Sequence, residues 1–131
     1  MASVLKVDTL TGVTTAGSIA VTGEGNSTTT NLQQGLIKAW ASRTSAADPA
    51  TTDSFNVDSL TDNGVGDTIY NVSSVMSNDD GACACANQSS NSDFGLFGQW
   101  NTASQLRTYS RNSSNQDTDR AVTIIGAGDL A

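Results

Sequence analysis

Hydrophobic and polar residues alternate with a period of two along most of this chain, which predicts β-strands rather than helices. The pattern is clearest over residues 54–72, "SFNVDSLTDNGVGDTIYNV", where two alternating runs flank a polar segment that contains glycine. Asn63 and Gly64 lie in that segment and both tolerate a positive φ, so we expect a hairpin there, with a bulged turn or a loop of about four to five residues. Phe55, Val57 and Ser59 are expected to share one face of its first strand.

Other short alternating runs are separated by segments rich in Gly, Asn and Ser. They predict further strands at 36–42, 82–86, 94–100, 104–110 and 121–128. No segment supports a helix longer than about two turns. This spacing is typical of an all-β fold, and we expect an antiparallel β-sandwich with a jelly-roll-like arrangement.

The first 22 residues contain two weaker alternating stretches around a turn region at 12–17. Two strands this short are not stable alone, so this arm has to pack on the rest of the chain or on another subunit. A polar linker follows at 23–31. We therefore divide the chain into an arm and linker at 1–34, for attachment or trimerisation, and a β-sandwich module at 35–131. The candidate contacts of the arm are its apolar residues: Val4, Leu5, Val7, Leu10, Ile19 and Val21.

The composition favours a subunit that completes its core by association. Hydrophobic residues make up 37% of the 131 residues, below the share of roughly 45–50% that is usual for a globular domain. Disorder does not fit, because only 15% of the residues are charged and there is a single proline. A modest core of this kind predicts an oligomer.

The net charge of −7 excludes several classes of partner. An acidic chain whose six basic residues are scattered has no footprint for a phosphate backbone, so we expect no nucleic-acid partner. Its longest apolar runs are about five residues, far below the ~20 that a membrane span needs, so we expect no membrane insertion. The start, "MASVLKVDTL", lacks the pattern of a signal peptide, which predicts a protein made in the cytoplasm.

Few residues offer catalytic or metal-binding chemistry. The absence of histidine excludes Ser-His-Asp triads and most zinc sites. Cys83 and Cys85 would point to one face of a strand about 7 Å apart, which favours two small buried hydrophobic residues over a metal pair. We therefore expect no enzymatic activity, no cofactor and no metal.

Two acidic pairs and two aromatic residues each leave two interpretations open. Asp79–Asp80 and Asp117/Asp119 are either solvated turn residues or oxygen ligands for Ca²⁺. Trp100 and Tyr109 stand in polar surroundings and are either core residues or a platform for a glycan.

Two blocks of the chain resemble a module of known proteins. "GLIKAW" (35–40) and "SFNVDSLTDNGVGD" (54–67), followed by a turn with Met76 and a strand of small residues, resemble the C-terminal globular module of fibre proteins from marine and cyanobacterial phages. The N-terminal "MASVLKVDTL" is similar to the start of the same proteins. The chain departs from the pattern at 82–86, where the family has aromatic and valine residues, and it lacks the long shaft of many fibres.

This resemblance implies a trimeric, non-enzymatic protein on the surface of a virion. Without a shaft, the expected role is a capsid decoration (cement) protein or a short head fibre, in contact with the major capsid protein or other virion proteins. The alternative is a tail-fibre tip that recognises a glycan on the host surface. Capsid decoration implies many copies on each virion, whereas a tail fibre implies few.

Overall fold

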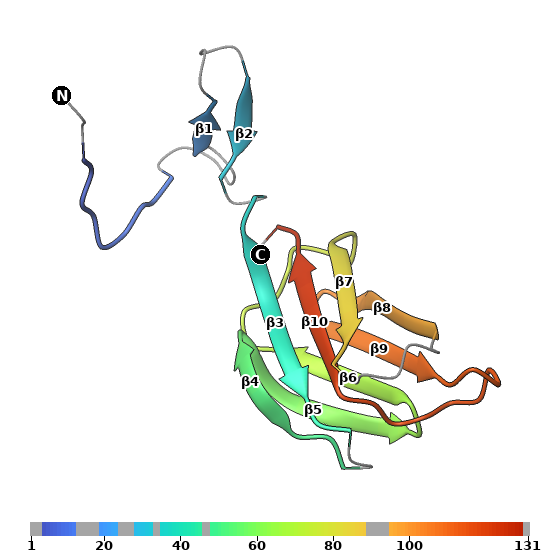
Figure 1. The fold of residues 1–131 in the computed structure, drawn as a ribbon. Helices are drawn as coiled ribbons and strands as arrows, with labels where there is room; N and C mark the ends of the chain where they lie inside the picture. The colour runs from blue at the N-terminus through green and yellow to red at the C-terminus, as the bar shows by residue number, and fades with distance from the viewer. Residues whose placement is uncertain are drawn as a thin grey trace. The chain divides into compact units, whose positions relative to one another are not determined.

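A computed structural model describes residues 4–12, 19–23, 28–32, 35–45, 48–88 and 95–129. The chain divides into two units, residues 1–35 and 36–131, while the predicted division lay after residue 34. All regular secondary structure in the described residues is β-strand, which confirms the predicted all-β class (Figure 1).

The N-terminal unit contains a small antiparallel hairpin of β1 (Ala20–Thr22) and β2 (Thr29–Asn31). The amide of Gly23 donates to the carbonyl of Thr28 at 2.9 Å, which closes the hairpin. The second strand therefore lies in the predicted linker, because its β-branched threonines favour the extended conformation. Residues 4–12 form no strand, so the strand expected there is wrong: these residues make no ladder with another described segment. Most of the turn expected at 12–17 lies outside the described residues.

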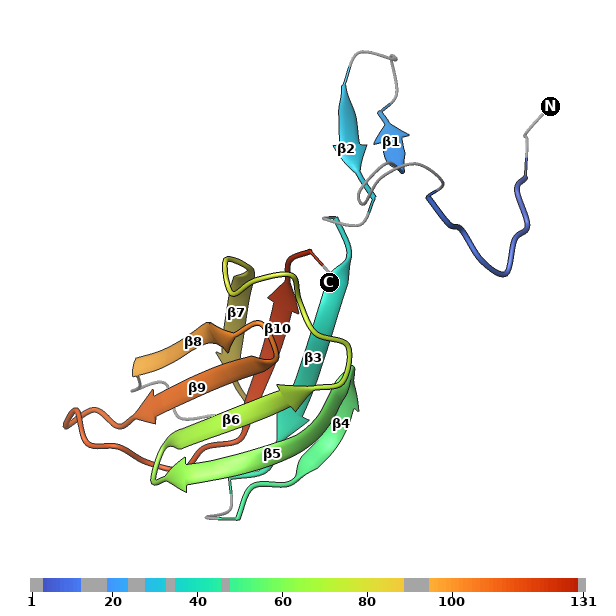
Figure 2. The same cartoon turned by 180° about the vertical axis from the view of Figure 1, so that it is seen from behind.

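The C-terminal unit is a sandwich of two four-stranded antiparallel sheets, as predicted (Figures 1 and 2). The first sheet, here called the β3–β10 sheet, has the order β4 (Thr51–Phe55), β3 (Ile37–Arg43), β10 (Val122–Ala127), β7 (Ala82–Asn87). The second, here called the β6–β9 sheet, has the order β5 (Val57–Gly64), β6 (Asp67–Val72), β9 (Gln105–Arg111), β8 (Gly95–Thr102).

The core lies between the two sheets and is built from alternating residues of their strands. Tyr70 and Val72 of β6 and Leu106 of β9 point inward. In β3 the sequence left the buried face open, and the structure buries the small residues Ala39 and Ala41. The buried hydrophobic cluster consists of Ala39, Ala41, Tyr70, Val72, Met76, Trp100, Leu106 and Ile124.

The chain crosses from one sheet to the other at Asn56, between β4 and β5. Asn56 has a φ of 56°, in the left-handed region that asparagine tolerates better than most residues. Its side-chain Nδ2 donates to the carbonyls of Lys38 (2.9 Å) and Ser74 (3.1 Å), and its Oδ1 accepts from the Ser74 amide (2.7 Å). The expectation that Phe55 and Val57 share the face of one strand is therefore wrong, because the turned backbone places them in different sheets.

The hairpin of β5 and β6 has a loop of two residues, Val65 and Gly66. The positive φ values belong to Gly64 (122°) and Gly66 (75°). Asn63 is instead the extra residue in an irregularity of register between Asp62 and Gly64. The predicted bulge is thus confirmed, but the turn lies further along the chain than the Asn63–Gly64 pair indicated.

Candidate functional site

Trp100 and Tyr109 do not form a shared platform. Trp100 lies in register with Leu106, is only 7% exposed, and its indole Nε1 donates to the carbonyls of Ala82 (3.2 Å) and Ala127 (3.3 Å). Tyr109 is three residues from Leu106 on β9, and residues an odd number apart on a strand face opposite sides. The glycan platform of these two rings is therefore wrong, since Trp100 belongs to the core and Tyr109 to the outer face of the β6–β9 sheet.

That outer face is largely satisfied by its own polar groups. The guanidinium of Arg107 forms an ion pair with Asp67 and lies 4.6 Å from the centroid of the Tyr109 ring. Side-chain amides of Asn71, Gln105 and Asn101 bond to one another or to hydroxyls of β5 across the strands. The large apolar exception is Phe97, which is 59% exposed and lies in register with Tyr109.

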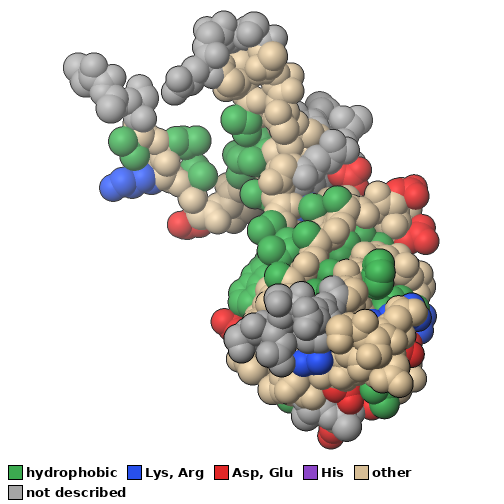
Figure 3. Space-filling model, turned by 45° about the vertical axis from the view of Figure 1, so that its right-hand side comes forward, with side chains coloured by type: hydrophobic (Ala, Val, Ile, Leu, Met, Phe, Trp, Pro, Cys, Tyr) green, Lys and Arg blue, Asp and Glu red, His purple; other side chains and the backbone are tan. Residues whose placement is uncertain are grey.

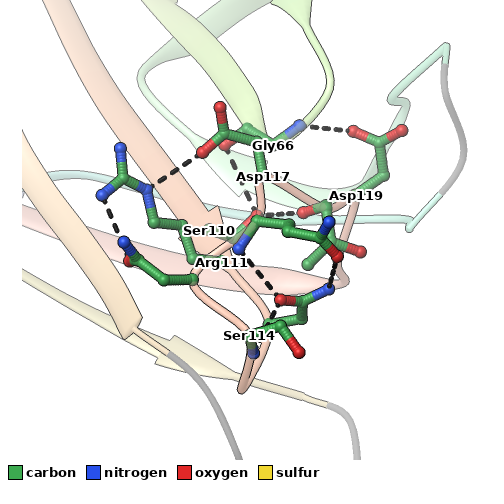
Figure 4. A network of polar contacts seen from close by, with 10 residues as sticks. Gly66, Ser110, Arg111, Ser114, Asp117 and Asp119 are labelled. Carbon is green, nitrogen blue, oxygen red and sulfur yellow. Dashed lines mark hydrogen bonds and ion pairs between the residues drawn. The ribbon is translucent and has the colours of Figure 1, made fainter.

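The Asp117/Asp119 pair holds a turn in place (Figure 4). The carboxylate of Asp117 accepts from Nε of Arg111 at 3.0 Å, and that of Asp119 accepts from the amide of Gly66 at 2.8 Å. Each carboxylate is thus engaged by a different donor, and Asp119 ties the segment after β9 to the β5–β6 loop. This arrangement favours the turn interpretation over a shared Ca²⁺.

The other acidic pair, Asp79 and Asp80, is exposed in the segment between β6 and β7. The side chain of Asn78 accepts from the amide of Asp80 at 3.0 Å, a local turn bond. Within the described residues, no group of three or more His, Cys, Asp or Glu side chains could hold a metal ion.

Cys83 and Cys85 point from β7 toward the core and are free thiols. Their sulfur atoms fill the space beside Gly98, where an added Cβ would lie 3.0 and 3.1 Å from them. Burial and the neighbouring Cys85 raise the pKa of the Cys83 thiol to about 11, and burial also raises the pKa of Cys85. Neutral thiols in this setting are packing groups, not nucleophiles.

Arg43, at the end of β3, is a buried charge that sequence analysis missed. Its side chain is fully buried, and Nη1 donates to the carbonyl of Thr44 at 3.1 Å. The alternating pattern of β3 places residue 43 on the same face as Ala39 and Ala41, which was the available clue. Burial raises the pKa of the Tyr70 hydroxyl, and the hydrogen bond with Thr108 and the charge of Arg43 offset only part of that rise.

The most distinctive surface is the outer side of the β3–β10 sheet. Cross-strand partners point to the same side, and one continuous row runs Phe55–Trp40–Ile125–Ala84 across all four strands. Beside it lie Ala127 and Ala82, which are paired, and Ile37, which pairs with Ala127 after a register irregularity that makes Lys38 the extra residue of β3. We call these seven residues the apolar face.

The apolar face is exposed although its residues are hydrophobic. Phe55 is 54% exposed, Ile37 52% and Ile125 38%, and Trp40 is half-buried. An aromatic side chain offers about 200 Å², so Phe55 alone leaves about 100 Å² of apolar area exposed. Hydrophobic side chains gather in one area of the surface of this unit in Figure 3. Contiguous exposed apolar area of this kind is typical of an interaction surface.

Polar residues border the apolar face on one side. In the next row, the hydroxyls of Ser42 and Thr123 lie 3.1 Å apart, and the side chain of Gln88 donates to both at 3.0 and 2.6 Å. Asp53 of β4 pairs with Ser42 and lies at the end of this polar row. It is the charged residue among the residues named in the polar row and in the apolar face. An apolar centre with a polar border is the usual anatomy of a protein interface.

The apolar face was not predicted from the sequence, although the chain contained two clues. Ile124 and Ile125 are consecutive in one strand, so both faces of β10 are apolar at that point. Trp40 alternates with Ala39 and Ala41, which were equally acceptable as core. The predicted arm residues Val4, Leu5, Val7, Leu10 and Val21 are each more than half exposed in the N-terminal unit, and Ile19 is half-buried.

Comparison with protein-family models, with curated proteins and with solved structures finds no match for this chain. Within the described residues, no helix is long and apolar enough to cross a membrane. The fold and the surface define an all-β sandwich with one apolar sheet face exposed.

Proposed function

We propose that this chain is a non-enzymatic structural protein of a tailed-phage virion, a capsid decoration protein or a short head fibre, which acts as a homotrimer on the particle surface. The observation that supports an assembly role is the apolar face, an uncharged surface on a protein of net charge −7. Such a surface suits lasting association with protein better than binding of a small polar substrate.

The resemblance to phage fibre modules supports the virion role, and each of its two blocks contributes residues to the apolar face. Residues 35–40 supply Ile37 and Trp40, and residues 54–67 supply Phe55. The second block also contains Asn56 and the β5–β6 turn, the two points where the backbone has a positive φ in this region. The matched residues are thus those that shape the sandwich and its apolar face.

Attachment to the particle is assigned to the N-terminal arm. Its apolar residues, among them Val4 and Leu5, are exposed in the described part of the arm. Deletion of residues 2–22 is expected to leave the sandwich folded, because residues 36–131 contain the whole core cluster. The deleted protein should then fail to join particles that the full-length protein decorates, as measured by co-sedimentation.

Normal occupancy of the particles by the deleted protein would exclude the arm as the anchor. The number of copies on each virion tests the role itself. A copy number that follows the capsid lattice indicates decoration, and a few copies confined to the tail indicate a fibre.

The second candidate function is recognition of a host glycan by a tail-fibre tip. The observation that favours it is the cross-strand pair of Phe97 and Tyr109 on the outer face of the β6–β9 sheet, beside Arg107. Aromatic rings flanked by polar side chains suit stacking against sugars. Binding to host cells that is lost in the Phe97→Ala variant and kept in the Phe55→Ala variant would favour this function over decoration.

A further inference from the structure

We propose that the apolar face is covered by a second copy of this chain, with the Phe55–Trp40 side of one copy packed on the alanine side of the next. The proposal rests on the proposed function only in that the chain works as an assembly of copies. It does not depend on a virion, on capsid attachment or on glycan binding.

Charge favours a second copy at this face over the rest of the surface. Each copy has a net charge of −7, so two copies repel one another across most approaches. None of the seven residues of the apolar face is charged. Lys38, which follows Ile37 in β3, is only 4% exposed, and Asp53 lies at the end of the bordering row. The copies can therefore meet here without burying a carboxylate of either one, and the association should tolerate high salt.

The side chains of the face are larger on its β4 and β3 side than on its β7 side. The β4 and β3 side has the large rings of Phe55 and Trp40, and the β7 side has only methyl groups, at Ala82 and Ala84. Two large sides would clash or leave gaps if they met. A large side set on a small side fills the space, as in any well-packed interface.

A contact between two different patches is heterologous, and it closes into a ring when the rotation between copies allows. Each copy then offers its large side to one neighbour and its small side to the other. A closed ring of three is the assembly that agrees with the expected homotrimer. A dimer whose two-fold axis runs parallel to the strands also sets the large side of each copy on the small side of the other. The cross-linking experiment below distinguishes this dimer from the ring of three.

The area of the face sets the expected strength. Four strands about 4.8 Å apart and about six residues long at about 3.3 Å each give a surface of roughly 19 by 20 Å, or about 400 Å². A standard interface buries about 800 Å² on each partner. In a two-fold dimer the whole face supplies about half of that area, and in a ring each of the two contacts uses about half of the face, so other surface also has to contribute. Phe55 is the most exposed of the large side chains of the face, so its replacement should shift assembly strongly toward monomer.

A pair of matched variants tests the proposal in the full-length protein. Phe55 and Phe97 are 54% and 59% exposed, and they lie on the outer sides of the two different sheets. Phe55→Glu should convert the oligomer to a monomer of 13.5 kDa by light scattering, whereas Phe97→Glu should leave the oligomer intact. Both variants should keep the wild-type circular dichroism spectrum.

A second variant tests whether the effect of Phe55→Glu comes from the apolar face and not from a local change of structure at residue 55. Ala84→Glu changes the opposite edge of the same face at an exposed alanine, and it should dissociate the oligomer as well. The proposal is overturned if the wild-type protein is a monomer at every concentration tested, or if both glutamate variants on the face remain oligomeric.

Disulfide cross-linking identifies which residues meet. Phe55 and Ala84 lie on the two edge strands of one sheet, three strand spacings or about 14 Å apart. Two cysteines need Cα atoms within about 7 Å, so Phe55→Cys and Ala84→Cys in one chain can join only between copies. The native thiols are removed by Cys83→Ser and Cys85→Ser in all samples.

Under oxidation the double variant should give cross-linked trimers on a non-reducing gel, and each single variant should not. Cross-linked dimers without trimers would replace the ring by a two-fold dimer through the same face. An oligomer that persists without any cross-link would overturn the proposal and assign the face to a different occupant. An oligomer joined through this face that does not decorate particles would refute the proposed function and leave this inference standing.

Discussion

Asn56 is expected to be a highly sensitive half-buried position of the sandwich, because it sets the point where the chain leaves one sheet for the other. Asn56→Ala removes the three side-chain hydrogen bonds to Lys38 and Ser74. It also places alanine at a φ of 56°, where asparagine is better tolerated.

The size of the effect follows from these two losses. Each hydrogen bond contributes about 1 kcal/mol net, so the three together contribute about 2–3 kcal/mol when partial exposure is included. The left-handed backbone adds about 1 kcal/mol for alanine. The expected loss of about 3–4 kcal/mol is a large part of the roughly 5–15 kcal/mol that stabilises a typical domain.

Urea unfolding, followed by circular dichroism at one protein concentration, measures this loss. With a slope of about 1.5 kcal/mol per molar urea, the midpoint should fall by about 2 M or more. Asn56→Gly separates the two contributions, because glycine accepts the backbone but lacks the amide. It should recover about 1 kcal/mol relative to alanine.

Asn115 offers a matched control elsewhere in the unit. Its φ is 59°, and its side chain makes one long bond, accepting from Nη1 of Arg111 at 3.4 Å in an exposed turn. Asn115→Ala should therefore cost only about 1 kcal/mol. If Asn56→Ala costs no more than Asn115→Ala, the amide of Asn56 does not hold the crossing between the sheets.

Two further predictions concern the β5–β6 turn and β7. Gly64→Val should cost about 1 kcal/mol or more in thermal unfolding, because the φ of 122° is strained for valine although the space is open, and an unchanged melting temperature would contradict this. Gly66→Ala should cost more than Gly64→Val, since its Cβ would lie 2.5 Å from the carbonyl oxygen of Ser110. The thiol of Cys83, with its pKa raised from 9.0 to about 11, should react slowly with a disulfide reagent at pH 8 and quickly once unfolded. Rapid reaction of the folded protein at pH 8 would refute the burial of this thiol. Because the pKa is raised in the folded state, the stability that this thiol contributes is present below pH 9 and is lost as the pH rises through 11.

Much of the fold followed from local pattern alone. The strand at 104–110 and the hairpin over 54–72 were predicted, because alternation with a period of two is a property of neighbouring residues. The alternation also separated Leu106 from Arg107 and Tyr109, but it did not say which side faces the core. The small residues of 82–86 indicated a buried strand face for Cys83 and Cys85 in the same way. The strands of the arm were less predictable from the sequence. A segment of only two or three threonine and valine residues forms a strand only when a second segment lies close enough to pair with it.

The apolar face and the crossing at Asn56 depended on the tertiary structure. Alternation shows that Trp40 and Ala41 face opposite sides, but which side is covered depends on the partner strand, and Ser42 meets Thr123 from 81 positions away. The left-handed turn at Asn56 interrupts a run whose letters continue to alternate, so nothing local marks the change of sheet. The sequence by itself thus determined which segments are strands, and only the packing of distant strands decided which of their faces became core and which remained exposed for a partner.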